Sequence, residues 1–303
     1  MNEPIITCQN LNHNFGKKQV LDNINFSIDA GEPIGLVGPN GAGKTTLFNI
    51  LCGYLHPSSG NISLFGHKPG ATKLIGKVSA LPQDAQLDPS FSIGAQLSFY
   101  AKLQGFSSKD ANSEALRVLE AVDLKTEFNH KPTTLSHGMG KRVAIAQSFI
   151  GKPSLVFLDE PTAGLDPVNT RTIRSIIAEQ TTDTTFIISS HDLNELGRLC
   201  QQVLMLEKGT IQSTLLDASH STNKSQFITL QLESYPATEV INTLQQLSGV
   251  IVIHNPQKNE YIIEYSELKE PNLDANILMR LSEKNWSYRQ LSRGKTLEEQ
   301  LFF

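Results

Sequence analysis

The chain has 303 residues, of which 39% are hydrophobic, so it is long enough for about two domains with packed cores. Its 26 Lys and Arg residues stand against 30 Asp and Glu residues without a dense basic block, which argues against a nucleic-acid partner. Residues 1–4 lack the basic start of a signal peptide, and no segment reaches the ~20 apolar residues that span a bilayer.

A glycine-rich stretch, GPNGAGKTT, occupies residues 38–46 directly after an apolar run at residues 34–37 that is predicted to be a buried strand. Two further strands are predicted ahead of it, over residues 5–8 and 19–28, and a helix is predicted to begin within residues 46–51. Strand, Gly-x-x-x-x-Gly-Lys-Thr and helix in this order are typical of a loop that wraps phosphate groups. A glycine-rich turn that merely closes a strand is the alternative, but Lys-Thr in register favours a nucleotide site.

Each residue type in this loop has a physical role. Glycines at 38, 41 and 43 permit backbone angles that bring successive N–H groups around a phosphate chain at a helix amino terminus. Lys44 is predicted to reach the outer phosphates and the Thr45 hydroxyl to hold a magnesium ion. The candidate nucleotide-binding residues of the loop are Gly38, Pro39, Asn40, Gly41, Ala42, Gly43, Lys44, Thr45 and Thr46.

Two residues near the loop have open interpretations. Phe15, between the first two predicted strands, either packs into the protein beside a turn or stacks on an adenine base. Strands are predicted over residues 60–65 and 76–81, and Gln83 follows the second of them. From its position alone, Gln83 is a solvated loop amide.

A helical block is predicted between residues 92 and 132, where apolar residues recur at helix spacing. Because it lies between strands of the predicted nucleotide-binding sheet, it is expected to be an inserted subdomain, at about residues 85–150. The sequence Leu-Ser-His-Gly-Met at residues 135–139 follows, before a helix predicted over residues 140–150. Ser136 is a candidate helix N-cap, and the helix amino terminus is also able to meet an anion.

Two apolar strands end in the remaining candidate catalytic residues. The run at residues 154–158 is typical of a strand buried on both faces of a parallel sheet, and it ends in Asp159 and Glu160. Beside a phosphate loop, Asp159 is expected to help hold magnesium and Glu160 to polarise an attacking water, rather than only to cap the next helix. The run at residues 185–190 ends in His191, where open α/β folds place their ligand chemistry. A hairpin over residues 203–212 is predicted to follow.

Taken in order, these motifs resemble those of the ATP-binding subunits of ABC transporters over residues 3–215. The resemblance implies an α/β fold of the P-loop NTPase type with an inserted helical subdomain, spanning residues 1–215. The roles it implies are adenine stacking for Phe15, a magnesium contact and coupling to membrane subunits for Gln83, general base for Glu160, a terminal-phosphate contact for His191, and an interface position for Asp166.

One motif departs from the family pattern. The usual Leu-Ser-Gly-Gly-Gln appears as Leu-Ser-His-Gly-Met, which retains Ser136 and Gly138 but introduces His137 and Met139. This variant, like residues 81–105, resembles the bacterial export-type branch. We therefore expect an active ATPase in which Ser136 and Gly138 of one copy meet ATP held by the other copy.

The resemblance implies ATP and Mg²⁺ as ligands, and a homodimer working on two transmembrane permease subunits without nucleic acid. It places the chain in the cytoplasm, peripheral on the inner face of the plasma membrane, where the three widely spaced cysteines are expected to be reduced. An ABC-type ATPase acting on DNA or ribosomes would need long heptads or a second cassette, and the sequence has neither. A non-hydrolysing partner in a heterodimer is the other alternative, against which Lys44, Glu160 and His191 argue.

The remaining residues, 216–303, are predicted to form a small accessory domain behind a polar linker at residues 213–224. Strands and helices alternate there in the β-α-β-β-α-β order of a ferredoxin-like α+β domain. The predicted elements span residues 227–232, 237–247, 250–254, 261–265, 273–284 and 287–291. Its aromatic residues Tyr261, Tyr265, Trp286 and Tyr288 are expected in the core or in subunit contacts, and residues 296–302 resemble a closing motif of the export-type branch.

Overall fold

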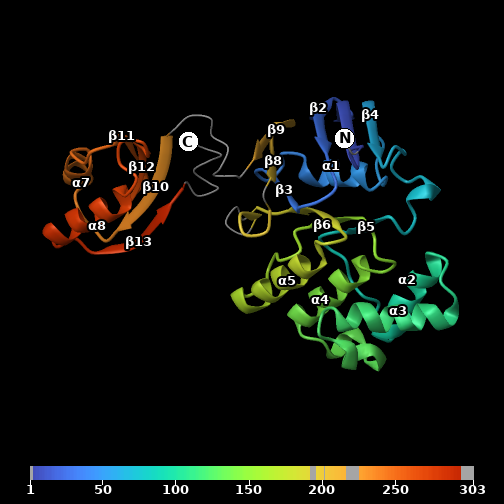
Figure 1. Ribbon diagram of the computed structural model, residues 1–303. Coiled ribbons are helices and arrows are strands. Elements are labelled where there is room, and N and C mark those ends of the chain that lie inside the picture. Colours follow the sequence, from blue (N-terminus) through green and yellow to red (C-terminus); the bar gives the residue numbers. More distant parts are fainter. Residues whose placement is uncertain (1–2, 192–195, 201, 216–224, 295–303) are drawn as a thin grey trace. The chain divides into compact units, whose positions relative to one another are not determined.

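The structure is a computed structural model that describes residues 3–191, 196–200, 202–215 and 225–294. The chain divides into two compact units, residues 1–215 and residues 216–303. The larger unit contains two sheets and the smaller unit one (Figure 1). Each unit has its own buried core.

The larger unit is built on a six-stranded sheet that is parallel except for its last strand. In spatial order the strands are β5 (Val78–Leu81), β6 (Leu155–Asp159), β7 (Thr185–Ser189), β3 (Ile34–Val37), β8 (Gln202–Glu207) and β9 (Thr210–Leu215). Every residue of β3, β6 and β7 is buried, as their continuous apolar sequences predict for central strands. The carboxyl ends of these three strands carry the phosphate loop, the acidic pair and His191.

A second, antiparallel sheet packs over the helix that follows the phosphate loop. Its strands, in spatial order, are β2 (Lys18–Ile28), β1 (Ile6–Phe15) and β4 (Ser59–Leu64). Helix α1 (Lys44–Leu51) lies between the two sheets (Figure 1). Its Leu47, Phe48 and Ile50 belong to one core with residues of both sheets. This packing fixes the amino terminus of α1, where the loop ends.

The helical block is inserted between β5 and β6, which are neighbours in the sheet. It contains α2 (Ile93–Leu103), α3 (Ser108–Glu120), the short 3-10 helices η2 (Lys125–Asn129) and η3 (Pro132–Thr134), and α4 (His137–Ser148). A serine hydroxyl accepts a backbone N–H at the start of each α-helix, as expected for N-caps. Because Ser136 is the cap of α4, that helix begins at His137 and not at residue 140 as predicted.

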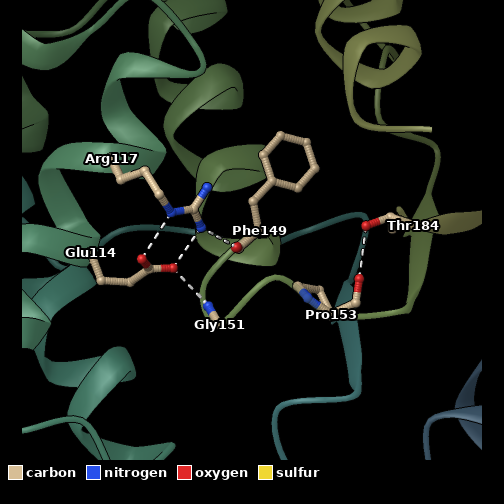
Figure 2. A network of polar contacts seen from close by, with 6 residues as sticks. All are labelled: Glu114, Arg117, Phe149, Gly151, Pro153 and Thr184. Atoms are coloured by element: carbon tan, nitrogen blue, oxygen red, sulfur yellow. Dashed lines mark hydrogen bonds and ion pairs between the residues drawn. The ribbon is translucent and has the colours of Figure 1, made fainter. Parts of the chain in front are cut away.

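An ion pair within α3 is hydrogen-bonded to the turn after α4 (Figure 2). Both Arg117 Nε and Nη2 donate to the Glu114 carboxylate, at 2.8 and 2.5 Å, and Nη2 also donates to the Phe149 carbonyl oxygen at 2.8 Å. The Gly151 N–H donates to Glu114 at 2.8 Å. Burial opposes ionisation of Glu114, but its hydrogen bonds to Arg117 and Gly151 outweigh that effect and hold its pKa below the usual value.

The smaller unit has the predicted β-α-β-β-α-β order and an antiparallel sheet with the strand order of a ferredoxin-like fold. Its elements are β10 (Ser225–Leu232), α7 (Ala237–Leu244), β11 (Val250–Gln257), β12 (Glu260–Ser266), α8 (Leu273–Glu283) and β13 (Tyr288–Arg293). Tyr261 and Tyr265 lie in its core, which Trp286 joins from the edge, whereas Tyr288 is exposed.

Several boundaries differ from those predicted, among them the ends of β1 and β9. Strand β1 continues to Phe15, because residues 9–15 pair with β2 and β4 through several register shifts that no simple alternation reveals. Strand β9 continues to Leu215, so residues 213–215 belong to the sheet and not to a linker. The closing motif at residues 296–302 lies outside the described residues.

Candidate nucleotide site

The phosphate loop connects β3 to α1, in the order that the sequence predicts. Gly41 and Gly43 have φ angles of 82° and 107°, which residues with a Cβ atom rarely adopt. Gly38 is needed for another reason, since a Cβ there would lie 2.1 Å from the carbonyl oxygen of Leu206. The expectation that the backbone angle explains all three glycines is therefore wrong for Gly38, where close packing against β8 requires glycine.

The only cationic side chain of the loop, that of Lys44, is buried and hydrogen-bonded to the loop backbone. Lys44 is 9% exposed, and its Nζ donates to the carbonyl oxygens of Gly38 at 2.6 Å and Pro39 at 3.4 Å. It lies at the amino terminus of α1, whose unpaired N–H groups add partial positive charge. Both features suit an anionic ligand.

A cavity of about 350 Å³ brings this loop together with four other segments. Its lining consists of Phe15 (β1), Lys18 and Val20 (β2), Asn40, Gly41, Gly43, Lys44, Thr45 and Thr46 (loop and α1), Gln83 (after β5), and Asp159 and Glu160 (end of β6). Phe15 is 54% exposed, so its ring is open to a ligand on one side, while the His13 ring meets it edge-on at 4.7 Å. A polar loop, a free aromatic face and two carboxylates thus surround one space.

The acidic pair is buried and tied to the neighbouring strand. Asp159 and Glu160 are each 8% exposed, and the Ser189 hydroxyl on β7 donates to Asp159 Oδ1. Glu160 has a φ of 49°, and its N–H donates to the Ser189 hydroxyl at 3.0 Å. His191 Nδ1 lies 2.8 Å from Glu160 Oε2, so the two candidate catalytic side chains are in direct contact.

Burial raises the pKa of Cys52 to about 12, and the Asp159 charge adds to that rise.

The oxygen donors in the cavity fit a magnesium ion. Thr45, Gln83 and Asp159 supply a hydroxyl, an amide and a carboxylate to one space, and Mg²⁺ prefers such ligands together with phosphates and water. In the part of the chain that the structure describes, no group of three or more His, Cys, Asp or Glu residues could hold a metal by itself.

The remaining predicted residues lie outside this cavity. Ser136 lines a second cavity, of about 410 Å³, together with Gln83, His137 and Lys141. Gly138 packs against Asn169, whose side-chain N–H donates to Asp166 Oδ2 at 2.6 Å. Gly38 and Pro39 contact the cavity-lining Lys44 through their carbonyl oxygens. His191 contacts the cavity-lining Glu160, and Ala42 is buried within the loop.

Asp166 has a structural function in this chain as the N-cap of α5 (Pro167–Gln180). Its side chain accepts the N–H groups of Val168 and Asn169, at 2.9 and 3.0 Å. The Asn169 backbone N–H, followed by the Asn169 side chain, lowers the pKa of Asp166.

Several polar residues at and around the site were not predicted, among them Lys18 in the lining of the cavity. Ser189 binds both acidic residues, Asn169 joins Gly138 to Asp166, and Lys141 Nζ donates to the Gln83 carbonyl oxygen at 3.0 Å. Each contact joins segments that are distant in the sequence, and periodicity gives no signal for it. Ser189 alone offers a hint, as a polar residue at the end of an apolar strand.

The fold and this cavity define a nucleotide-binding protein of the P-loop NTPase class. A family model described as "ABC transporter" matches residues 21–163. A protein named "Uncharacterized ABC transporter ATP-binding protein YdbJ" from Bacillus subtilis is 32% identical over 283 residues, covering 92% of this chain and 89% of the relative. The chain belongs to the family of ABC transporter ATP-binding proteins, as the resemblance of its motifs predicts.

Other relatives and solved structures support the same family assignment. The Nod factor export ATP-binding protein I of Burkholderia lata is 35% identical, over 67% of this chain and 68% of its own, and the linearmycin resistance ATP-binding protein LnrL of Bacillus subtilis is 34% identical over 68% and 67%. Among structures, cbiO1 from Clostridium perfringens, part of the transporter complex cbiONQ, has a TM-score of 0.64 and 28% identity, covering 71% of this chain and 90% of that chain. A dimeric ATP-binding cassette, MJ0796, in a post-hydrolysis state with ADP and Pi, has a TM-score of 0.63 and 25% identity, covering 70% and 99%.

Proposed function

We propose that this chain is the ATP-hydrolysing subunit of an ABC exporter, working as a homodimer on two separate permease subunits at the inner face of the plasma membrane. The observation that carries the proposal is the cavity that joins the phosphate loop and Phe15 to Asp159 and Glu160. The export direction rests on the Ser-x-Gly-Met motif and on relatives named for Nod factor export and linearmycin resistance.

In the proposed reaction, Phe15 stacks on adenine, and the loop N–H groups with Lys44 bind the phosphates. Glu160 accepts a proton from the attacking water, and His191 both orients the Glu160 carboxylate and contacts the terminal phosphate. Thr45, Gln83 and Asp159 would hold Mg²⁺, which neutralises charge on the phosphates when it is bound. Burial of the carboxylates strengthens these electrostatic effects, because water screens them poorly there.

The dimer is proposed because one chain does not complete the site. Ser136 and Gly138, at the amino terminus of α4, are absent from the lining of the cavity that contains Lys44. The family arrangement places them on the nucleotide of a second copy, which makes each site a composite of two chains. The dimeric state of the MJ0796 cassette supports the same arrangement.

The permease is proposed to dock on the helical segment. In the described part of the chain, no helix is long and apolar enough to cross a membrane. Exposed apolar side chains gather on and beside α2, namely Phe91 (57% exposed), Phe99 (56%) and Leu103 (64%). Phe91 and Phe99 line a cavity of about 450 Å³, and an apolar hollow of this kind suits a partner segment.

Subunit complementation tests the composite site. Lys44→Ala removes the phosphate contact, and Ser136→Arg blocks the amino terminus of α4, where Ser136 is exposed, so each variant alone should be inactive. Mixed dimers contain one intact composite site, and mixing the two variants should therefore restore ATP hydrolysis. A mixture as inactive as its parts, under conditions in which mixed dimers form, would contradict the proposal.

Docking of the permease is tested by the double variant Phe91→Asp with Phe99→Asp. It should reduce co-sedimentation of the chain with permease membranes and leave ATP hydrolysis by the free chain unchanged.

A further inference from the structure

We infer that Ser189 is a positioning residue for both acidic groups of the site, through a single buried hydroxyl. The inference rests on the proposed function and deepens it. Strand β7 ends at Ser189, directly beside Asp159 in the parallel register of β6 and β7. The serine is 0% exposed, so water does not compete for its hydrogen bonds.

The hydroxyl makes two contacts of opposite kind. Ser189 Oγ donates its proton to Asp159 Oδ1 and accepts the Glu160 N–H at 3.0 Å. A serine hydroxyl has one proton and two acceptor lone pairs, so its only donor is committed to Asp159. That bond restrains the carboxylate of Asp159, which also lines the cavity where a cation would bind.

The second contact stabilises an unfavourable backbone. Glu160 has a φ of 49°, in the left-handed region that residues with a Cβ atom seldom occupy. Its N–H is shared between the Ser189 hydroxyl and the Ser189 carbonyl oxygen, at 3.0 and 3.2 Å. Held in this way, the Glu160 carboxylate reaches His191 Nδ1 at 2.8 Å. One side chain thus orients the candidate magnesium ligand and, through the backbone, the candidate base.

The test compares Ser189→Ala, Ser189→Thr and Ser148→Ala. Ser148 is a matched control, because its hydroxyl is also buried (1% exposed) and donates to a carbonyl oxygen, that of Ile145 at 2.7 Å, outside the site. Nucleotide affinity is measured with a fluorescent ATP analogue in EDTA and across a magnesium titration, alongside kcat and the melting temperature.

Outer contacts to metal ligands change metal affinity or activity about 10- to 100-fold. Ser189→Ala should therefore lower kcat and raise the half-saturating Mg²⁺ concentration by about 10-fold or more. Analogue binding in EDTA should stay at the wild-type level, because the loop is untouched. Ser189→Thr restores the hydroxyl and should recover most of both losses, while Ser148→Ala should match wild type.

Two results would overturn the inference. One is a Ser189→Ala variant with wild-type kcat and magnesium dependence. The other is parallel loss of melting temperature, EDTA binding and activity in that variant, which would mark a purely structural serine. Should wild type itself fail to hydrolyse ATP, the proposed function fails, but the magnesium-dependent difference in analogue binding still decides the role of Ser189.

Discussion

His191 Nδ1 lies 2.8 Å from Glu160 Oε2, although the two residues follow different strands, β7 and β6. Glu160 is buried, whereas the His191 side chain is 67% exposed. The pair therefore connects the interior of the acidic site with its open side, where a terminal phosphate and an attacking water would enter.

Glu160→Gln should lower turnover sharply while ATP binding is retained. The amide retains the size of the side chain and a contact to His191 but cannot accept the proton of the attacking water. A general base contributes about 10²- to 10⁴-fold to the rate, so kcat should fall by that factor with ATP affinity retained. Single-turnover hydrolysis and equilibrium binding measure the two quantities separately, and hydrolysis by the variant at the wild-type rate would refute the assignment.

Phe15→Ala should weaken ATP binding while leaving kcat at saturation nearly unchanged. Stacking of a base on an aromatic ring contributes about 1–3 kcal/mol, which corresponds to a rise in Kd of about 5- to 150-fold. Phe15→Tyr keeps the ring and should bind ATP like wild type. Calorimetric titration measures the Kd for ATP of both variants. Phe99→Ala is the control for the loss of an exposed aromatic side chain elsewhere. Equal affinity in Phe15→Ala and wild type would exclude stacking.

Gly138→Ala should destabilise the fold through Asn169. The added Cβ would lie 2.4 Å from Asn169 Oδ1, and that amide is held by Asp166 at 2.6 Å. Overpacking of this kind costs about 1–3 kcal/mol in the free energy of unfolding. Urea denaturation of Gly138→Ala, Asn169→Ala and the double variant forms a double-mutant cycle. The double variant should recover most of the loss, and strict additivity would contradict the contact.

Glu114→Gln should lower stability at neutral pH. Hydrogen bonds to charged groups contribute about 1.5–3 kcal/mol each, so a deficit of about 1–3 kcal/mol is expected. The folded-state pKa of Glu114 is depressed, so its contribution is fully present above the unfolded-state pKa and disappears as pH falls through the folded-state pKa.

The difference in the free energy of unfolding between wild type and Glu114→Gln, measured by urea denaturation, should therefore disappear on acidification below pH 4.5, the ordinary pKa of a glutamate carboxyl. Glu120→Gln is the control, since the Glu120–Lys125 pair is exposed and surface pairs contribute about 0–1 kcal/mol. A difference in the free energy of unfolding that stays constant with pH would show that the charge of Glu114 does not contribute to stability.

The sequence predicted most of the fold because the central strands carry continuous apolar runs that meet chemical motifs at their ends. Strand β3 has the predicted limits, and the smaller unit has the predicted order of elements. What the sequence could not predict depends on pairing across long separations. The Ser189 contact to Asp159 requires the register of β6 with β7, and the need for glycine at position 38 follows from the proximity of Leu206. No local pattern encodes either distance.

The most direct test of the central claim is ATP hydrolysis by the purified chain across a range of protein concentrations, with Lys44→Ala as the blank. A composite site formed by two copies predicts specific activity that rises with protein concentration and disappears in the blank. Nucleotide binding without hydrolysis at any concentration, or activity that survives Lys44→Ala, would contradict a homodimeric ATPase built on this site.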